Sequence, residues 1–403
     1  MIVLSGADLV LPGSVQSEGT LVIDGERIAR IGASGATGAL GAVGVPAAHV
    51  IDLRNHIVLP GFIDVHVHGL DGIDTLDGGD VIGAIAQRLP KFGVTGFCPT
   101  TVACAPDALR DVLQSVAVLR SSAQGGARVL PAHLESNFIN PDFRGAQPLA
   151  CLRMPPSQAH STHHRHGFDG RDILSEIDSA GDNVGIVTLA PELEGALDLI
   201  RHLASSGRRV SLGHSGATLE QSRAAIAAGA RHATHLFNRM PALSHRDPGL
   251  VGAILTSEEV AAEIIGDGVH VHRDMVRMAV RAKGVSRMMA ITDGVAAAGL
   301  PEGSTASLGG REIRVKNSAA YLNDGTLAGS VATMDRVFRF LVTEVGLSLN
   351  DAAQMCATTP ASELGLKDTG VITNGAIADL VVMDRDFNVT HTFIAGRLVY
   401  TRH

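Results

Sequence analysis

Eight short apolar runs, rich in β-branched residues, recur through the middle of this chain. In order they are IVLPGFIDVHVH, VTGFCPTT, RVLPAHLE, VGIVTLAPE, RVSLGHS, ATHLF, EIIGDGVH and MMAITDG. Helical patterns separate most of them, as in 193–204, where one stripe contains Leu193, Ala196, Leu197, Ile200 and Leu203. Eight strands alternating with helices over roughly 240 residues predict an α/β fold, a (β/α)8 TIM-like barrel. A doubly wound sheet is the alternative, but no G-x-G-x-x-G follows any of the runs.

Both ends of the chain have a different, β-rich pattern. The segment GTLVIDGERIARIGA alternates and bends at Asp24-Gly25, which is typical of a hairpin. The segment ADLVVMDRDFNVTHTFIAGRLVY reads as strands interrupted at 384–386 and at Gly396. We therefore expect residues 1–55 and 372–403 to form one small β-sandwich, and residues 56–371 to form the barrel.

Charge and hydropathy exclude several classes of partner. A formal net charge of −8 argues against general nucleic-acid binding, although a few local arginines can still bind a small anion. No apolar stretch reaches the roughly 20 residues of a membrane span. The start, MIVLSGADLVLPG, lacks the basic region and cleavage site of a signal peptide. We expect a cytoplasmic protein with no membrane partner, and unpaired thiols at Cys98, Cys104, Cys151 and Cys356.

Histidines and carboxylates gather where the predicted strands end. His66 and His68 share one face of the first strand, because residues two apart in a strand point the same way. An isolated H-x-H is more often a pair of satisfied histidines, but later strand ends supply four further groups: Glu135, His214, His235 and Asp293. In a barrel these ends meet at one mouth. Imidazole and carboxylate suit Zn²⁺ and similar ions, and six ligands fit two metals that share a carboxylate.

The segment PGFIDVHVHG resembles the first-strand signature of the amidohydrolase superfamily. Further segments are similar to N-acetylglucosamine-6-phosphate deacetylases: HLESNFINPDFRGAQP, VTLAPE, GHSGAT, ATHLFNRMPALSHRDPGLVGAIL, DGVH, ITDG and DGTLAGS. They occur in the family's order and cover essentially the whole chain. The resemblance implies hydrolysis of the N-acetyl group of N-acetylglucosamine 6-phosphate, or of a close N-acetylhexosamine 6-phosphate, to an amino-sugar 6-phosphate and acetate.

The resemblance also assigns roles at the metal site. It implies that Glu135, His214 and His235 are the metal ligands shared by all members. His66, His68 and Asp293 correspond to the second site of the binuclear members, and Asp293 also to the catalytic aspartate. This implies two divalent metal ions per chain, with zinc as the first choice and iron, manganese or cobalt as alternatives.

The substrate contacts follow from the same resemblance. It implies that His270 and Arg246 bind the sugar phosphate, with Arg246 reaching in from the neighbouring subunit of a homodimer. The backbone at Asn238 and Arg239 would also meet the phosphate. Gln147 stands where other members have His or Gln near the substrate.

Two departures leave the identity of the sugar open. The family usually reads HLEGPF where this chain has Ser136 and Asn137, and it tends to have a small residue in place of Arg239. We expect both changes to touch the substrate pocket rather than the metals. The His-rich segment 157–169 is expected to be a solvated insertion, with a metal-binding loop as the alternative.

Other functions remain as alternatives. One is an amidohydrolase acting on a different amide, such as N-acetylgalactosamine 6-phosphate or a cyclic amide. Many cyclic amidases bridge their metals with a carboxylated lysine, but none of the four lysines here ends a predicted strand; they are Lys91, Lys283, Lys316 and Lys367. A non-catalytic barrel is the second alternative, and it is disfavoured because all six candidate ligands are present.

Overall fold

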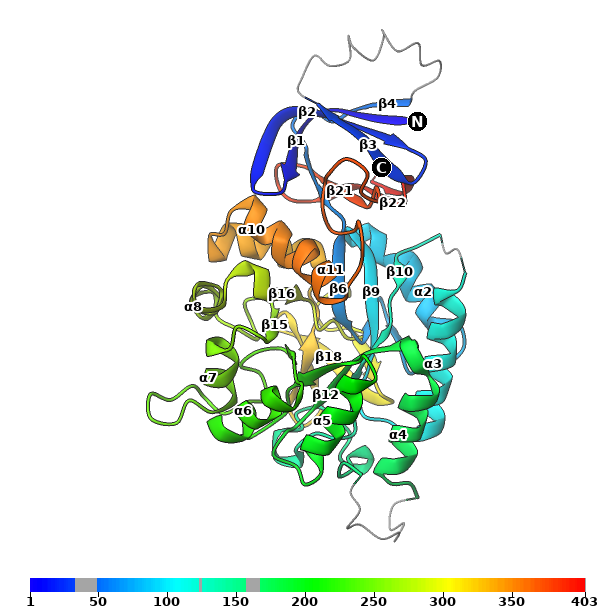
Figure 1. Ribbon diagram of the computed structural model, residues 1–403. Coiled ribbons are helices and arrows are strands. Elements are labelled where there is room, and N and C mark those ends of the chain that lie inside the picture. Colours follow the sequence, from blue (N-terminus) through cyan, green and yellow to red (C-terminus); the bar gives the residue numbers. More distant parts are fainter. Residues whose placement is uncertain (33–48, 123–124, 157–166, 403) are drawn as a thin grey trace.

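The computed structural model describes residues 1–32, 49–122, 125–156 and 167–402. Figure 1 shows a barrel surrounded by helices and, at one end of it, a separate sheet made from both ends of the chain. The predicted combination of an α/β barrel with a terminal β-structure is thereby confirmed. Residues 157–166, most of the His-rich segment, lie outside the described residues.

The barrel consists of eight parallel strands in chain order. They are β6 (Phe62–Val67), β9 (Val94–Thr101), β11 (Ala132–Glu135), β12 (Val184–Leu189), β13 (Arg209–Leu212), β14 (His232–Ala233), β15 (Ala261–Ile265) and β16 (Met288–Ile291). Each strand pairs with the next. A parallel bridge between Val67 and Gly294 joins the first strand to the segment after the last, which nearly closes the barrel. The short β10 (Arg128–Val129) also pairs with β9.

Amphipathic helices cover the barrel because each buries one apolar stripe against the strands. On α5, the buried positions are Ala196, Leu199, Ile200 and Leu203, much of the stripe expected from the sequence. The α-helices are α2 (Val81–Arg88), α3 (Pro106–Arg120), α4 (Gly170–Ser179), α5 (Ala196–Ser205), α6 (Leu219–Ala228), α7 (Gly249–Thr256), α8 (Arg273–Lys283), α9 (Met334–Phe340), α10 (Leu349–Ala353) and α11 (Thr359–Glu363).

Shorter helical turns complete the connections. The 3₁₀ turns are η1 (Leu89–Phe92), η2 (Pro141–Phe143), η3 (Leu149–Cys151), η4 (Gly181–Asn183) and η5 (Val285–Arg287). Two π-helical turns, η6 (Leu341–Val345) and η7 (Gln354–Thr358), follow α9 and α10.

The two ends of the chain share one sheet with its own apolar core. Its strands are β1 (Ile2–Leu11), β2 (Ser14–Asp24), β3 (Arg27–Gly32), β4 (His49–Asp52), β5 (Ile57–Pro60), β21 (Leu380–Met383), β22 (Val389–Ile394) and β23 (Arg397–Thr401). Their order is β23-β22-β21-β5-β1-β2-β3, with β4 beside β1. Asp24 pairs with Arg27, so the predicted hairpin is confirmed. The domain boundaries at 55/56 and 371/372 stay a prediction.

A four-stranded antiparallel sheet after β16 is an addition that the sequence analysis did not anticipate. It contains β17 (Thr305–Leu308), β18 (Arg311–Lys316), β19 (Ala319–Leu322) and β20 (Leu327–Ser330). Gly309 and Gly310, with φ of 54° and 78°, form the two-residue turn between β17 and β18, which needs positive φ at both positions. A two-stranded hairpin, β7 (Gly69–Leu70) with β8 (Ile73–Asp74), follows β6.

The four cysteines are unpaired, as expected. Cys98, Cys104 and Cys356 are buried, and burial raises the pKa of Cys104 to about 12. Within the described ranges, no helix has both the length and the apolar character that spanning a membrane requires.

Candidate active site

A cavity of about 500 Å³ opens at the carboxyl ends of the barrel strands. In barrels of this kind, chemistry is placed at this face. The cavity lining includes most of the residues predicted from the sequence: His68, Glu135, Gln147, His214, His235, Asn238, Arg239, His270 and Asp293. Leu308, Leu327 and Gly329 also line it, so the four-stranded sheet forms part of the wall.

The first cluster of candidate ligands is formed by the ends of β11, β13 and β14. Oε1 of Glu135 lies 2.9 Å from Nε2 of His214 and 2.8 Å from Nε2 of His235. The two Nε2 atoms are themselves 3.0 Å apart. All three side chains are buried and offer one ligand atom each to a common point.

The second cluster joins the first strand to the last. Nε2 of His66 and Nε2 of His68 are 3.1 Å apart. Both face Oδ1 of Asp293, at 3.3 and 3.4 Å. Oε2 of Glu135 lies 3.5 Å from Nε2 of His68, so this carboxylate faces both clusters.

These distances fit a divalent metal. Zinc–nitrogen bonds of 2.0–2.1 Å at a tetrahedral angle place two ligand nitrogens about 3.4 Å apart. The paired nitrogens at 3.0 and 3.1 Å are close to that spacing. Two imidazole lone pairs facing each other at this distance repel unless a proton or a cation lies between them. The donor set is therefore suited to hold metal ions.

The local backbone aims three of these side chains by an unusual conformation. His214, His235 and Asp293 have φ of 48°, 27° and 49°, in a region that L-residues rarely adopt. Each of them lies two residues after the end of a barrel strand, namely β13, β14 and β16. Such strain is typical of functional sites, where the surrounding structure holds it in place.

Charges within the site stabilise one another. Burial by itself would lower the pKa of His66, but the carboxylates of Asp293 and Glu263 outweigh it and raise that pKa to about 9. The pKa of His68 is likewise raised to about 10, by its hydrogen bonds with Asp293 and Glu135 against the effect of burial. Burial opposes ionisation of Asp293, yet His66 and His68 hold its pKa below the ordinary value. A site that favours positive charge so strongly also attracts divalent cations.

Most of the predicted substrate contacts lie in the wall of the same cavity as the candidate ligands. Nδ1 of His270 lies 2.6 Å from Oδ2 of Asp267, which fixes the ring at the cavity wall. The amide of Gln147 donates to Glu135 and accepts from the backbone N–H of Ala103. Asn238 and Arg239 follow His235 in the loop after β14, and both line the cavity. Nη2 of Arg239 donates to the carbonyl of Leu327 at 3.3 Å.

Arg246 is not brought into the cavity of its own chain. It lies in an exposed segment between Pro241 and Pro248, and its backbone N–H is 3.4 Å from the hydroxyl of Ser244.

One of the two departures from the family pattern, Ser136-Asn137, does not line the cavity, contrary to our expectation. The hydroxyl of Ser136 donates to the carbonyl of Thr188 at 2.5 Å. The amide of Asn137 donates to the carbonyls of Cys104 and Cys151 at 2.8 and 2.7 Å. Both side chains thus bind backbone carbonyls, and neither is among the residues that line the cavity. Arg239 does line the cavity.

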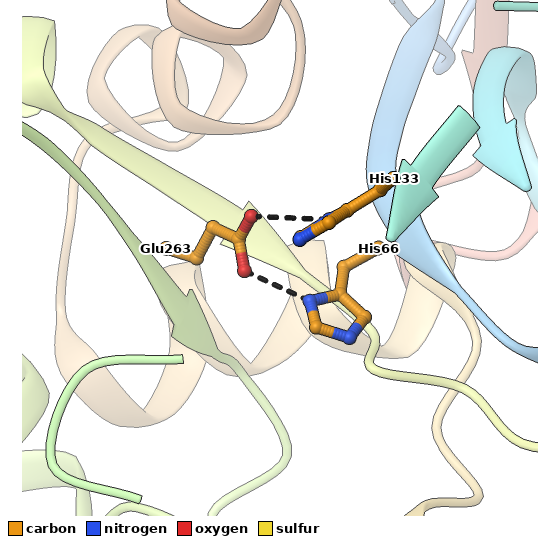
Figure 2. Close-up of side chains that lie close together, drawn as sticks. All are labelled: His66, His133 and Glu263. Atoms are coloured by element: carbon orange, nitrogen blue, oxygen red, sulfur yellow. Dashed lines mark hydrogen bonds and ion pairs between the residues drawn. The ribbon is translucent and has the colours of Figure 1, made fainter. Parts of the chain in front are cut away.

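A buried polar group behind the candidate ligands was missed from the sequence. Figure 2 shows Glu263 of β15 facing His66 and His133. Burial would raise the pKa of Glu263, but His133 and His66 hold it well below its ordinary range. The signal was a single carboxylate inside the apolar run VAAEIIG. Among the described residues, His66, His133 and Glu263 form a further group whose ligand atoms lie close enough together to hold a metal ion.

Comparison with known proteins agrees with this fold and site. The model of the Amidohydrolase family matches residues 57–399. This class of protein is metal-dependent, and the chain has His/Glu groups able to hold a metal. The N-acetylglucosamine-6-phosphate deacetylase of Mus musculus is 40% identical over 361 residues, or 87% of this chain and 85% of the relative. That of Bacillus subtilis (strain 168) is 35% identical over 349 residues, covering 85% of each.

Solved structures give the same result. The Pasteurella multocida N-acetylglucosamine-6-phosphate deacetylase has a TM-score of 0.88 at 28% identity and covers 100% of both chains. A mutant of the Mycobacterium smegmatis enzyme, in complex with N-acetyl-D-glucosamine-6-phosphate, has a TM-score of 0.86 at 32% identity and covers 99% of both. The present chain therefore belongs to the amidohydrolase family, within its group of N-acetylglucosamine-6-phosphate deacetylases.

Proposed function

We propose that this chain hydrolyses N-acetylglucosamine 6-phosphate to the amino-sugar 6-phosphate and acetate. The observation that carries the proposal is the convergence of the six candidate ligands, in a chain related over most of its length to such deacetylases. Five of them line one cavity, and His66 lies directly against two of these five, His68 and Asp293. The structural relative with N-acetyl-D-glucosamine-6-phosphate bound supports the substrate class.

In this proposal the site holds two divalent ions, zinc being the first choice and iron, manganese or cobalt the alternatives. One ion would be held by Glu135, His214 and His235, and the other by His66, His68 and Asp293; Glu135 faces both groups. When bound, such ions lower the pKa of a coordinated water to about 7 and polarise the amide carbonyl.

The chain's own groups then manage protons and substrate orientation. Asp293, which the neighbouring histidines keep ionised, takes the proton from the attacking water and passes it to the leaving amine. Gln147 orients Glu135 through the hydrogen bond between their side chains. Arg239, Asn238 and His270 lie on the wall where the sugar phosphate would be held.

We place the active enzyme in the cytoplasm as a homodimer. Arg246 then contributes its guanidinium to the phosphate of the neighbouring subunit's substrate, since it does not reach the cavity of its own chain. A guanidinium can form two hydrogen bonds to one phosphate, which suits the recognition of a dianion.

The alternative of a cyclic amidase is not favoured. Glu135 occupies the position between the two clusters that a carboxylated lysine holds in many such enzymes. No lysine is among the residues that line the described cavity.

An acetate-release assay over a panel of N-acetylhexosamines tests the proposal. We expect the highest kcat/KM for N-acetylglucosamine 6-phosphate and a much lower value for the unphosphorylated sugar. N-acetylgalactosamine 6-phosphate has the same acetyl and phosphate groups, so comparing its kcat/KM with that of N-acetylglucosamine 6-phosphate tests the preference for the sugar alone. A preference for it would contradict the proposed sugar, and no release of acetate from any of the three would contradict the proposed reaction.

Protein loaded with Zn²⁺ is expected to contain about two ions per chain. Because His66 belongs only to the second cluster, His66→Asn should reduce this content to about one ion. Elemental analysis after removal of free metal gives the measurement. One ion in the unsubstituted protein, unchanged by His66→Asn, would rule out the binuclear site.

A further inference from the structure

Glu263 is a carboxylate in the interior of the barrel, behind the candidate metal ligands. Its side chain is fully buried on β15, with 0% of its surface exposed. Its side-chain neighbours are the imidazoles of His66, His232 and His133. Placing a carboxylate here costs several kcal/mol unless charge or hydrogen bonds compensate. We therefore expect this buried carboxylate to have a specific role at the site.

The contact with His66 determines which nitrogen of that ring carries a proton. Nδ1 of His66 lies 2.9 Å from Oε2 of Glu263. Figure 2 marks this contact with a dashed line. A carboxylate accepts, so Nδ1–H donates. Metal binding requires the neutral ring, and in that form Nε2 presents its lone pair to the cluster with His68 and Asp293.

The carboxylate is itself held in place from two further sides. Oε1 accepts a hydrogen bond from Nε2 of His232 at 2.9 Å. Oε2 also accepts from the backbone N–H of His235 at 3.3 Å. These hydrogen bonds restrict rotation of the Glu263 side chain. Through Glu263 they also restrict the orientation of the His66 ring.

His66, His133 and Glu263 do not require an ion of their own. Nδ1–H of His133 donates to the carbonyl of Val65 at 3.0 Å, and its Nε2 accepts from the hydroxyl of Thr188 at 2.8 Å. Both ring nitrogens of His133 are thus used, and Nδ1 of His66 is used by Glu263. Within this group, only Nε2 of His66 remains to bind a metal ion, and it faces the second cluster.

We infer that Glu263 is a positioning residue for His66: its carboxylate fixes the tautomer and the orientation in which Nε2 of His66 binds a metal ion. The inference rests on the proposed role of His66 as a ligand. Carboxylates that hydrogen-bond a metal-binding imidazole raise its basicity, and their loss typically weakens metal binding 10- to 100-fold.

Two substitutions separate the charge from the contact. Glu263→Ala removes both, and we expect it to weaken Zn²⁺ binding about 10- to 100-fold. Glu263→Gln keeps an acceptor for Nδ1–H of His66 but removes the charge, so its effect should be smaller. Competition with a chelator of known affinity measures the Zn²⁺ affinity. The visible spectrum of the Co²⁺-loaded protein reports the geometry of the ligands, and we expect it to change in Glu263→Ala.

Glu363→Gln is the matched control for a merely structural carboxylate. Glu363 is also buried, at 6% exposure, and pairs with Arg209 and Arg287 at 3.1 and 2.9 Å. It is not among the residues of the cavity. Its substitution should lower the unfolding temperature and leave the Zn²⁺ affinity unchanged. If Glu263→Ala does not fold, the comparison of Glu263→Gln with Glu363→Gln still decides the question.

His66→Ala completes the design. In that background, Glu263→Gln should have almost no further effect on Zn²⁺ affinity, because the two act through one ligand. Unchanged affinity and an unchanged Co²⁺ spectrum in both Glu263 variants would overturn the inference, provided that His66→Ala weakens binding. If His66→Ala does not weaken binding, the proposed ligation itself fails. The assay contains no sugar, so an error in the proposed substrate leaves it unaffected.

Discussion

Asp293→Asn is expected to lower kcat for the deacetylation by about a thousandfold or more. An amide side chain cannot accept the proton of the attacking water or return it to the leaving amine, and general acid–base groups contribute about 10²–10⁴-fold. The substrate contacts on the other wall of the cavity are untouched, so KM should change little. Steady-state kinetics on fully metal-loaded protein measures both constants.

Metal content must be measured with the rate, because Asp293 also faces His66 and His68. Asp74→Asn is a suitable control: Asp74 is buried, accepts from the backbone of Leu76 and Gly309, and is not part of the cavity lining. It should retain a kcat close to that of the unsubstituted protein. Turnover at the unsubstituted rate in a fully metallated Asp293→Asn protein would refute the role of Asp293.

The second large effect concerns Arg246. Arg246→Ala should raise KM for the 6-phosphate substrate by about 10- to 100-fold, since hydrogen bonds to charged groups contribute about 1.5–3 kcal/mol. The unphosphorylated sugar should be affected much less. Arg223→Ala, which removes another exposed arginine, on α6, should change neither value. Equal effects of Arg246→Ala on both substrates would contradict phosphate recognition.

Mixing the two impaired proteins, at a substrate concentration well below the raised KM, tests whether Arg246 acts across subunits. A heterodimer of an Arg246→Ala chain and an Asp293→Asn chain has one site with both groups intact. We therefore expect activity to return when the two proteins exchange subunits. Exchange demonstrated without any return of activity would contradict the cross-subunit role and leave the phosphate role to the KM comparison.

The sequence predicts the barrel and the placement of its chemical groups because both depend on local pattern. Apolar β-branched runs define the strands, and a polar residue at the carboxyl end of a parallel strand must face the common mouth. His66, Glu135 and Asp293 could be found in this way although they are far apart in the chain. Their roles as ligands remain a prediction.

What the sequence did not predict depends on contacts across the barrel. Glu263 reads as an exception in an apolar run, because its partners His66 and His232 come from other strands. Ser136 and Asn137 sit next to a candidate ligand, but the turn after β11 directs them to backbone carbonyls. The sheet β17–β20 has short strands, and its residues fall within the range 56–371 that the sequence pattern assigned to the barrel.

The contacts that close the barrel also bring together the two parts of the second cluster of candidate ligands. The hydroxyl of Thr292, just after β16, donates to Asp64 of β6 at 2.6 Å across 228 residues of sequence. Val67 and Gly294 pair beside it. During synthesis, a chain still lacking β16 has His66 and His68 but no Asp293 opposite them. The complete centre therefore forms only after about three quarters of the polypeptide has left the ribosome. Under the proposed ligation, the second cluster can hold a metal ion only after β16 has been synthesised, and chains truncated before β16 would lack this site.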